Sequence, residues 1–173
     1  MTASSTSNSN DERAQQWVTT ARILADGELP PGWALVNSSA FARVAHHPGE
    51  QLFFKLFLPR SPFESIKAIA RGSRATRARQ HNDDLRRAGI EAPQNIAWGR
   101  LAQGREFLFS SAVAGMGIDH WIRRELPAGS RDSLARRRTL MRELGVFIGR
   151  LHHSGFIHGD LRSGNVLACL LYT

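Results

Sequence analysis

The stretch that decides the fold is His158-Gly159-Asp160-Leu161-Arg162-Ser163-Gly164-Asn165, which follows an apolar helical pattern and precedes the apolar pair Val166-Leu167. Its polar residues stand at set offsets, with a cation two residues after the Asp and an Asn five residues after it. In phosphoryl transfer from ATP, such an Asp accepts the proton of the acceptor hydroxyl and such an Asn holds Mg²⁺. The spacing therefore predicts a kinase catalytic loop, with Asp160 as base, Asn165 as metal ligand and Arg162 neutralising charge on the transferred group.

A plainer interpretation of these residues is an ordinary turn. Asp often caps turns and Asn tolerates a left-handed backbone, so Asp160 and Asn165 alone fit that interpretation. The number of matched positions favours the catalytic loop. The neighbouring histidines 152, 153 and 158 lack the spacing of a zinc ligand pair and have no Glu between them, so a zinc site is disfavoured. We expect His158 to brace the loop by hydrogen bonds.

Length and amino-acid composition limit the types of protein to which this chain can belong. A chain of 173 residues suffices for one domain, or for one and a half small ones. The single cysteine, Cys169, cannot form an internal disulfide. The sequence shows neither a signal peptide nor an apolar run of about 20 residues, the length of a membrane-spanning helix. We therefore expect a soluble, cytoplasmic protein. The net charge of +8 comes from arginine, because only Lys55 and Lys67 are lysines. This excess favours an anionic partner, such as lipid headgroups, a phosphorylated glycan or nucleic acid.

Local patterns predict the first elements of the chain. Residues 1–16 are rich in Ser, Thr and Asn and are expected to form a disordered tail. Residues 33–44 predict two strands around the turn Asn37-Ser38-Ser39, and residues 52–58 predict another strand. The segment His46-His47-Pro48-Gly49-Glu50 is expected to be the connecting turn, with both histidines exposed.

Start and stop signals predict the helices. Ser61 as N-cap, Pro62 at the first helical position and Glu64 in a capping box indicate a helix that ends near Gly72. The remaining expectations are helices over 73–89, 119–125 and 130–153, and strands at 95–98 and 106–113. This order predicts an α+β, protein-kinase-like fold, with an antiparallel N-lobe over residues 17–112 and the beginning of a helical C-lobe over residues 113–173.

Lys55 is the candidate for binding nucleotide phosphates. It interrupts the apolar run Leu52-Phe53-Phe54-Lys55-Leu56-Phe57-Leu58, about a hundred residues before the catalytic loop, in a chain with only one other lysine. A lysine whose stem lies along an exposed strand face is the alternative. The rarity of lysine favours the phosphate-binding role.

Two other segments of the predicted nucleotide site, residues 37–41 and residues 109–113, have weaker sequence patterns than Lys55. In sequence order, residues 37–41 correspond to the Gly-rich loop that covers the phosphates in kinases, but they contain no glycine. They fit an ordinary turn equally well. Residues 109–113 are expected to form the hinge between the lobes, where Ala112 and Val113 would meet adenine and Val44 would pack against it. Only their position in the chain supports this assignment.

The sequence resembles the bacterial lipopolysaccharide kinase family, which includes the Kdo and heptose kinases. The resemblance covers most of residues 33–167 and rests on the following stretches: Phe54-Lys55-Leu56-Phe57, Arg71-Gly72-Ser73-Arg74-Ala75 leading to Gly89-Ile90 and Pro93, Val113-Ala114-Gly115, and Leu151-His152 through Leu167. It implies ATP as donor, Mg²⁺ as cofactor and a sugar hydroxyl of the lipopolysaccharide inner core as acceptor. It also implies Lys55 as the phosphate-binding lysine, Asp160 as the base and Asn165 as a metal ligand.

Two departures from the kinase pattern stand out. The helix acid that pairs with the phosphate-binding lysine is not evident, because the expected position near Ala78 is apolar and Asp83 and Asp84 lie further along. The sequence ends eight residues after Asn165, which predicts a truncated C-lobe and weak or absent activity. The basic helix over 71–87 is expected to touch anionic lipid. The alternatives are another small atypical kinase, of the type that serves the tRNA-threonylcarbamoyl machinery, and a non-catalytic module that binds anions. An aminoglycoside phosphotransferase is disfavoured, because that family places a longer insertion between the lysine and the loop.

Overall fold

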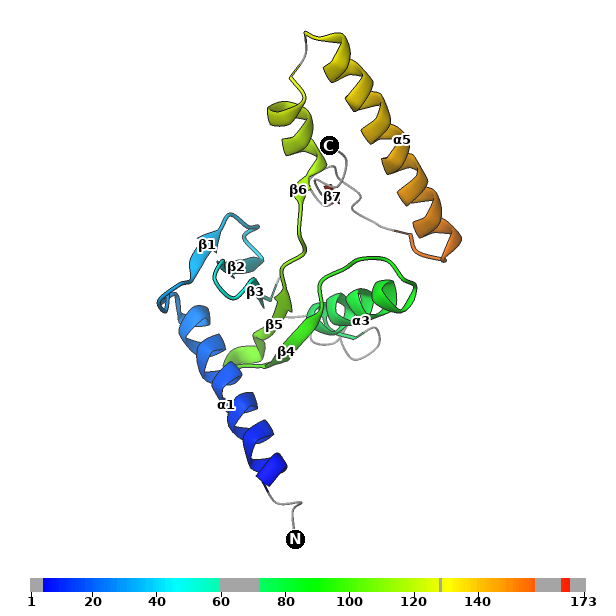
Figure 1. The fold of residues 1–173 in the computed structure, drawn as a ribbon. Helices are drawn as coiled ribbons and strands as arrows, with labels where there is room; N and C mark the ends of the chain where they lie inside the picture. Colours follow the sequence, from blue (N-terminus) through cyan, green and yellow to red (C-terminus); the bar gives the residue numbers. More distant parts are fainter. Residues whose placement is uncertain (1–4, 60–71, 128, 158–165, 169–173) are drawn as a thin grey trace. The chain divides into compact units, whose positions relative to one another are not determined.

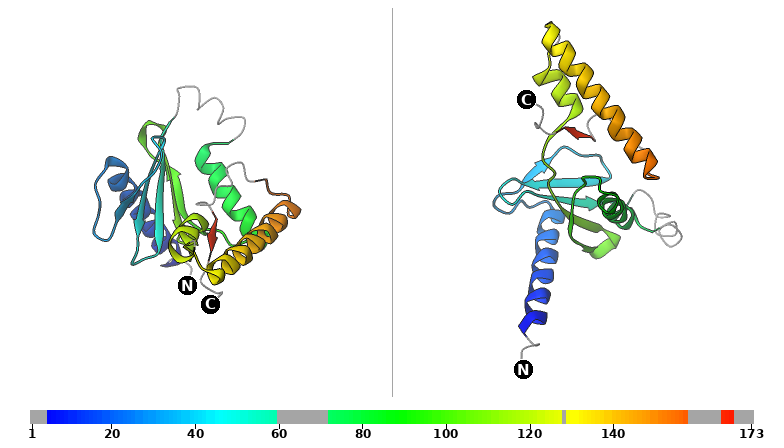
Figure 2. Two further views of the ribbon diagram at one scale, coloured as in Figure 1. Left: turned by 90° about the horizontal axis from the view of Figure 1, so that it is seen from above. Right: turned by 45° about the vertical axis from the view of Figure 1, so that its right-hand side comes forward.

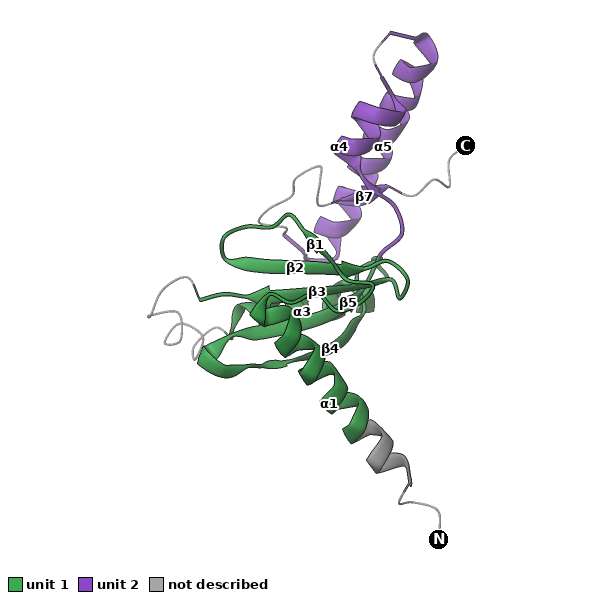
Figure 3. Cartoon of the chain, turned by 90° about the vertical axis from the view of Figure 1, so that its left-hand side faces the viewer, with its two compact units in different colours: residues 1–112 green, residues 113–173 purple. Residues whose placement is uncertain are grey.

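A computed structural model describes residues 5–59, 72–127, 129–157 and 166–168, with side chains from residue 11 onward. The chain divides into two compact units, residues 1–112 and residues 113–173 (Figure 3). The division falls between Ala112 and Val113, where the sequence places the border between N-lobe and C-lobe. No described helix is long and apolar enough to cross a membrane.

Unit 1 is built on an antiparallel sheet of five strands in the order β1-β2-β3-β5-β4. Its strands are β1 (Ala34–Val36), β2 (Ala42–His47), β3 (Leu52–Phe57), β4 (Asn95–Arg100) and β5 (Glu106–Ser111). The short turn η1 (Ala102–Gly104) joins β4 to β5. The sheet and its central strand β3 agree with the sequence prediction, because β-branched and aromatic runs between turn residues are strong strand signals.

Helices cover both faces of this sheet, α1 (Ser5–Asp26) on one face and α3 (Arg74–Arg87) on the other (Figures 1 and 2). Side chains alternate along a strand, so β3 supplies both layers. Phe54 and Leu56 join the core under α1, whereas Phe57 packs with Leu108 and with Ala75 of α3.

Helix α1 corrects the expectation of a disordered tail over residues 1–16, since its helical backbone begins at Ser5. Its C-terminal half carries the apolar residues, and Trp17 lies 4.8 Å from Phe109 between ring centroids. Once that half is anchored on the sheet, each further turn adds hydrogen bonds without a new nucleation cost. Amino-acid composition alone does not predict that a helix extends in this way from an anchored half.

The histidines at the end of β2 are a second correction. His46 and His47 belong to the strand and are half-buried, so the connecting turn begins at Pro48. The ring of His46 stacks on Phe53 at 4.3 Å between centroids, and His47 packs edge-on against Trp33 at 5.3 Å. Aromatic cross-strand partners extend the ladder past the point where the sequence predicted its end.

The described residues of unit 2 form a small two-stranded sheet and two helical segments (Figure 1). The small sheet pairs β6 (Met116–Gly117) with β7 (Leu167–Ala168), which are antiparallel. The first helical segment combines α4 (Ile118–His120) with the single π-turn η2 (Trp121–Glu125), and the second is α5 (Arg131–His153). Ser130 caps α5 at its first turn, and Gly155 with φ 82° follows its end, as the sequence predicted.

Candidate functional site

Lys55 lies at the middle of the sheet, on the face that α3 covers. Its cross-strand partners are Val44 on β2 and Leu108 on β5, and directly opposed residues in antiparallel strands share a face. Lys55 is exposed although its strand neighbours Phe54 and Leu56 are buried on the opposite face. The sheet therefore presents one lysine to solvent beside a half-buried valine, which are two of the residues predicted to meet the nucleotide.

The ammonium of Lys55 lies in a partly desolvated and electropositive environment. Its Nζ is 5.3 Å from the centroid of the Phe57 ring. Burial against neighbouring protein atoms, and secondly the charge of Arg74, hold the pKa of Lys55 below its ordinary value. None of the ion pairs among the described residues includes Lys55. An anionic ligand would offset both effects.

Helix α3 places Arg74 at this site. Ser73 accepts a hydrogen bond from the backbone N–H of Thr76 at 3.0 Å and so begins the helix, as its sequence predicted. Arg74 Nη1 donates to the backbone oxygens of Phe41 at 3.2 Å and of Leu58 at 3.0 Å. The first turn of α3 is thus joined to the end of the 37–41 turn and to the end of β3.

Among the described residues, the acids of α3 contact groups other than Lys55. Ala78 packs against the cluster of Phe57, Ala75 and Leu108. Asp83 instead accepts a hydrogen bond from Asn95 at 2.7 Å. Asp84 pairs with Arg87 one turn away. The acids of this helix anchor it to β4 and to itself.

The 37–41 turn is held by its own hydrogen bonds. Ser38 Oγ donates to the backbone oxygen of Ala42 at 2.9 Å, and Ala42 N–H donates to the oxygen of Ser39 at 3.0 Å. Polar side-chain bonding of this kind is typical of Ser-rich turns. The contact between Phe41 O and Arg74 connects this turn to the neighbourhood of Lys55.

The stack of His46 on Phe53 lies on the same sheet face as Lys55, since Phe53 is two residues before it and His46 is opposite Phe53. The Nε2 atom of His46 is buried and has no hydrogen-bond partner among the described residues. Sequence analysis missed this pair because it assigned His46 to a turn. The alternation of side chains between the two sheet faces continues along β2 through His46, and this pattern could have indicated that His46 belongs to the strand.

Ala112 and Val113, the predicted hinge residues, lie on either side of the division between the two units in the sequence. Ala112 N–H donates to the backbone oxygen of Gln51 at 2.6 Å, just beyond the end of β5. Val113 begins unit 2 and is half-buried. Strand β5 ends at Ser111 rather than at Val113, so Ala112 and Val113 are linker residues.

Asp160, Arg162 and Asn165 lie outside the described residues, as do His158 and the predicted helix over 61–71. The residues that flank the loop are described in unit 2. Phe156 N–H donates to Leu151 O at 3.1 Å, and Ile118 N–H donates to Val166 O at 3.1 Å. The described residues contain no group of three His, Cys, Asp or Glu side chains that fits a metal ion.

The comparisons with known proteins support the fold. No family model matches the sequence, and no curated protein matches it. Among solved structures, a crystal structure of WbdD is similar over 80% of this chain, with a TM-score of 0.50 and 20% identity. A co-crystal structure of WbdD with the kinase inhibitor LY294002 gives a TM-score of 0.44 at 22% identity.

A third similar structure is the aminoglycoside phosphotransferase APH(3'')-Id from Streptomyces rimosus ATCC10970, with a TM-score of 0.39, 23% identity and 61% of this chain covered. The chain spans 29% of the length of WbdD and 34% of the length of the phosphotransferase. The five-stranded antiparallel sheet with its flanking helices is a protein-kinase-like fold, of the type predicted from the sequence.

Proposed function

We propose that this chain is an ATP-dependent phosphotransferase of the lipopolysaccharide kinase type, with a sugar hydroxyl of the lipopolysaccharide inner core as acceptor. The observation that carries the proposal is Lys55, an exposed cation on the central strand of a kinase-like sheet that forms no ion pair among the described residues. A partly desolvated ammonium favours an anionic ligand, and ATP phosphates suit it. The acceptor class rests on the sequence resemblance.

The roles follow the kinase pattern. Lys55 holds the donor phosphates, while Val44 packs on the adenine and Ala112 and Val113 meet its edge. Asp160 takes the proton of the acceptor hydroxyl, and Arg162 neutralises charge on the transferred phosphoryl group. Mg²⁺ held at Asn165 would supply the charge neutralisation between the phosphates that such reactions need.

Nucleotide binding is tested first, by calorimetry with ATP and Mg²⁺ on the wild type and on Lys55→Met. Methionine keeps the packing of the stem on the sheet and removes the charge. We expect the variant to lose most of the affinity, because hydrogen bonds to charged groups are among the stronger polar contacts. Lys67→Met is the matched control with the same charge change. Equal ATP affinity in all three proteins rejects the role of Lys55.

Phosphoryl transfer is tested with radiolabelled ATP on deacylated inner-core lipopolysaccharide, with Asp160→Asn beside the wild type. Incorporation that depends on Asp160 supports the proposal. Transfer to a protein or to a component of the tRNA-threonylcarbamoyl machinery would identify another small kinase instead. ATP binding without transfer to any acceptor would favour a non-catalytic binding module. Sedimentation with anionic and neutral vesicles tests whether residues 71–87 hold the protein at a membrane surface.

A further inference from the structure

Strand β4 is an edge strand, because the order β1-β2-β3-β5-β4 gives it a single neighbour, β5. Leu101 N–H, just past its end, donates to Arg105 O at 2.7 Å and so faces β5. Backbone groups of an antiparallel pair alternate in direction, so those of Gly99 face β5, whereas those of Trp98 and Arg100 point away from it. Within the described part of the chain, no backbone bond outside the β4–β5 ladder involves Trp98 or Arg100. We call these outward backbone groups the β4 edge.

A groove of about 520 Å³ lies beside the β4 edge, between this strand and the N-terminal half of α1. The two elements lie side by side in Figures 1 and 3. The strand is accessible to solvent here, since Trp98 is 52% exposed. Helix α1 contributes Arg13, Ala14, Trp17 and Val18 to the lining, and the sheet contributes the apolar side chains of Ile96, Ala97 and Phe107.

Arg13 is the one charged residue that lines the groove, and it is exposed. It takes part in none of the ion pairs among the described residues. The preceding residues 1–10 contain no Asp or Glu. Asp11 and Glu12 are two and one residues before Arg13 on the same helix, and helix residues so spaced do not face each other. The groove is therefore complementary to an apolar ligand that also carries a carboxylate.

We propose that the β4 edge and this groove form a docking site for an extended, acidic peptide segment of a partner protein, which adds to the sheet as a further strand. Backbone donors and acceptors at every second residue match those of another strand. Alternate side chains of that segment would enter the groove, and a carboxylate would contact Arg13. Ala97 is opposite Phe109 and shares the α1 face, so the site is separate from Lys55 and does not depend on the proposed function.

The test uses the full chain and a labelled synthetic peptide of about eight residues, within the usual length of a strand, with glutamates at one end followed by alternating valine and threonine. Fluorescence anisotropy measures binding, and NMR measures amide hydrogen exchange. We expect the peptide to slow exchange at Trp98 and Arg100 and to leave Gly99, which already faces β5, unchanged. No binding overturns the proposal, as does binding without this protection.

Backbone pairing is tested with two N-methylated peptides, each blocking one alternate set of amides. Only one set faces the β4 edge, so one of these peptides should bind about tenfold more weakly or worse, and the other should bind like the parent. Equal affinities of the two N-methylated peptides overturn the proposal, because strand addition distinguishes the two sets.

Variants of α1 test the groove. Ala14→Phe fills it from an exposed position and should weaken binding about tenfold. Gln15→Phe adds the same ring at an exposed position that does not line the groove, and it should change nothing. Arg13→Gln should weaken binding about two- to fivefold, because exposed ion pairs contribute little, and the loss should vanish when the glutamates of the peptide are replaced by glutamines. Equal affinities of Ala14→Phe and Gln15→Phe overturn the proposal.

A second copy of the chain is the competing occupant of the β4 edge. Sedimentation velocity of the chain without peptide distinguishes the two. We expect a monomer in which the amides of Trp98 and Arg100 exchange freely. A dimer in which both amides are already protected overturns the proposal, as does a monomer with the same protection. If Ala14→Phe fails to fold by circular dichroism, the N-methylated peptides on the wild type still decide the question.

Discussion

Helices α1 and α5 have nearly the same length, 22 and 23 residues, but only α1 contributes buried residues to a hydrophobic core cluster among the described residues. In unit 1, α1 contributes Ala21, Leu24 and Ala25 to a core with the aromatic residues of the sheet. In unit 2, α5 buries only Ser133 and Leu151 among its described side chains. An amphipathic helix is stabilised mainly by its packing partner, so the two units should differ in local stability.

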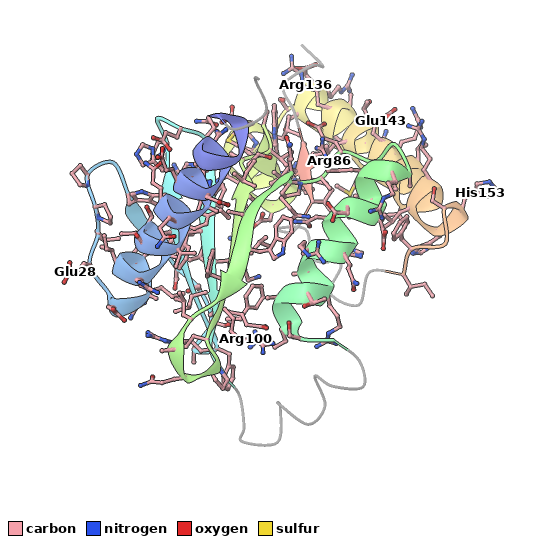
Figure 4. The ribbon with its side chains drawn as sticks, turned by 90° about the horizontal axis from the view of Figure 1, so that it is seen from below. Glu28, Arg86, Arg100, Arg136, Glu143 and His153 are labelled. Atoms are coloured by element: carbon pink, nitrogen blue, oxygen red, sulfur yellow. The ribbon has the colours of Figure 1, made fainter. Side chains whose placement is uncertain are left out.

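The apolar face of α5 lines a groove of about 480 Å³ in unit 2. Leu140, Leu144 and Phe147 line it together with Ile118 and Trp121, and the labelled residues Arg136 and Glu143 of α5 lie along it (Figure 4). On other parts of α5, Leu134, Met141 and Val146 are about half exposed. Unit 1, which carries Lys55, therefore has a closed core, whereas the described residues of unit 2, to which the predicted catalytic loop belongs, do not form one.

The largest expected effect is in the core of unit 1. Phe109→Ala removes a fully buried ring that contacts Trp17, Trp33 and Phe54, and such truncations cost about 3–5 kcal/mol of unfolding free energy. Met141→Ala on α5 should cost less than about 0.5 kcal/mol, because its side chain is 43% exposed. Urea unfolding followed by hydrogen exchange of peptides from each unit measures both. Equal loss of protection in β3 and α5 after Phe109→Ala would show one cooperative body.

Arginines that hold helix ends allow a matched test in both units. Arg43 Nη1 donates to Ala25 O at 2.9 Å at the end of α1, and Arg137 Nε donates to Leu126 O at 2.8 Å beyond η2. Arg43→Gln and Arg137→Gln should each cost about 1–2 kcal/mol, because carbonyls at a helix end lose a charged donor.

The control for both is Arg136→Gln, whose pair with Asp132 at 3.4 Å is solvent-exposed and should matter by about 0.5 kcal/mol or less. Hydrogen exchange should place the Arg43→Gln loss in α1 and the Arg137→Gln loss in α4, η2 and α5. A loss of protection spread evenly over both units would contradict the assignment of these bonds to local helix ends.

Elements with strong local signals were predictable from the sequence. Ser73 and Gly89 bracket α3, and Ser130 and Gly155 bracket α5, because capping depends on residues within one turn. The start of α1 was not predictable, since its helical N-terminal half has tail-like composition. The strand position of His46 was not predictable either, because it depends on stacking with Phe53 across the ladder. Contacts between distant residues decide both cases.

The features of the candidate site also fall into those that local sequence predicts and those that depend on contacts between distant residues. The strand position of Lys55 and the helix position of Ala78 could be predicted from local sequence, and the structure places them on β3 and α3. The approach of Arg74 to Phe57 could not, because it depends on how α3 packs on the sheet. The roles of Asp160, Arg162 and Asn165 stay predictions.

Binding to anionic vesicles should depend more on the arginines of α3 in unit 1 than on those of α5 in unit 2. The arginines of α3 were predicted to form a basic surface, but several have internal contacts: Arg74 and Arg86 bond backbone oxygens, and Arg79 lies 4.5 Å from the centroid of Trp98. We expect weak binding to phosphatidylserine vesicles that high salt abolishes, with Arg77→Gln reducing it by about fivefold at most. Sedimentation should show a smaller loss for Arg138→Gln on α5. Equal losses would mean that only net charge matters.

The smallest expected effect is the pH dependence that Lys55 gives to unit 1. Desolvation, followed by the charge of Arg74, lowers the pKa of Lys55 in the folded protein below its ordinary value of 10.5. The charged form is therefore disfavoured in the folded state, and this cost is fully present at pH values below the folded pKa. As the pH rises through the folded pKa toward 10.5, the unfolded chain binds more protons than the folded one, so the unfolding free energy contributed by Lys55 increases.

Urea unfolding at a series of pH values isolates this contribution as the difference between the wild type and Lys55→Met, in which the other titrating groups cancel. The difference should shift in favour of the wild type as the pH approaches 10.5, and the shift should be small because Lys55 reaches solvent. In Arg74→Gln the shift should shrink, since one of its two causes is removed. A wild-type advantage that falls with rising pH would mean that an anionic group stabilises the Lys55 ammonium in the folded protein, and the sheet face of unit 1 would then already be neutralised without a ligand.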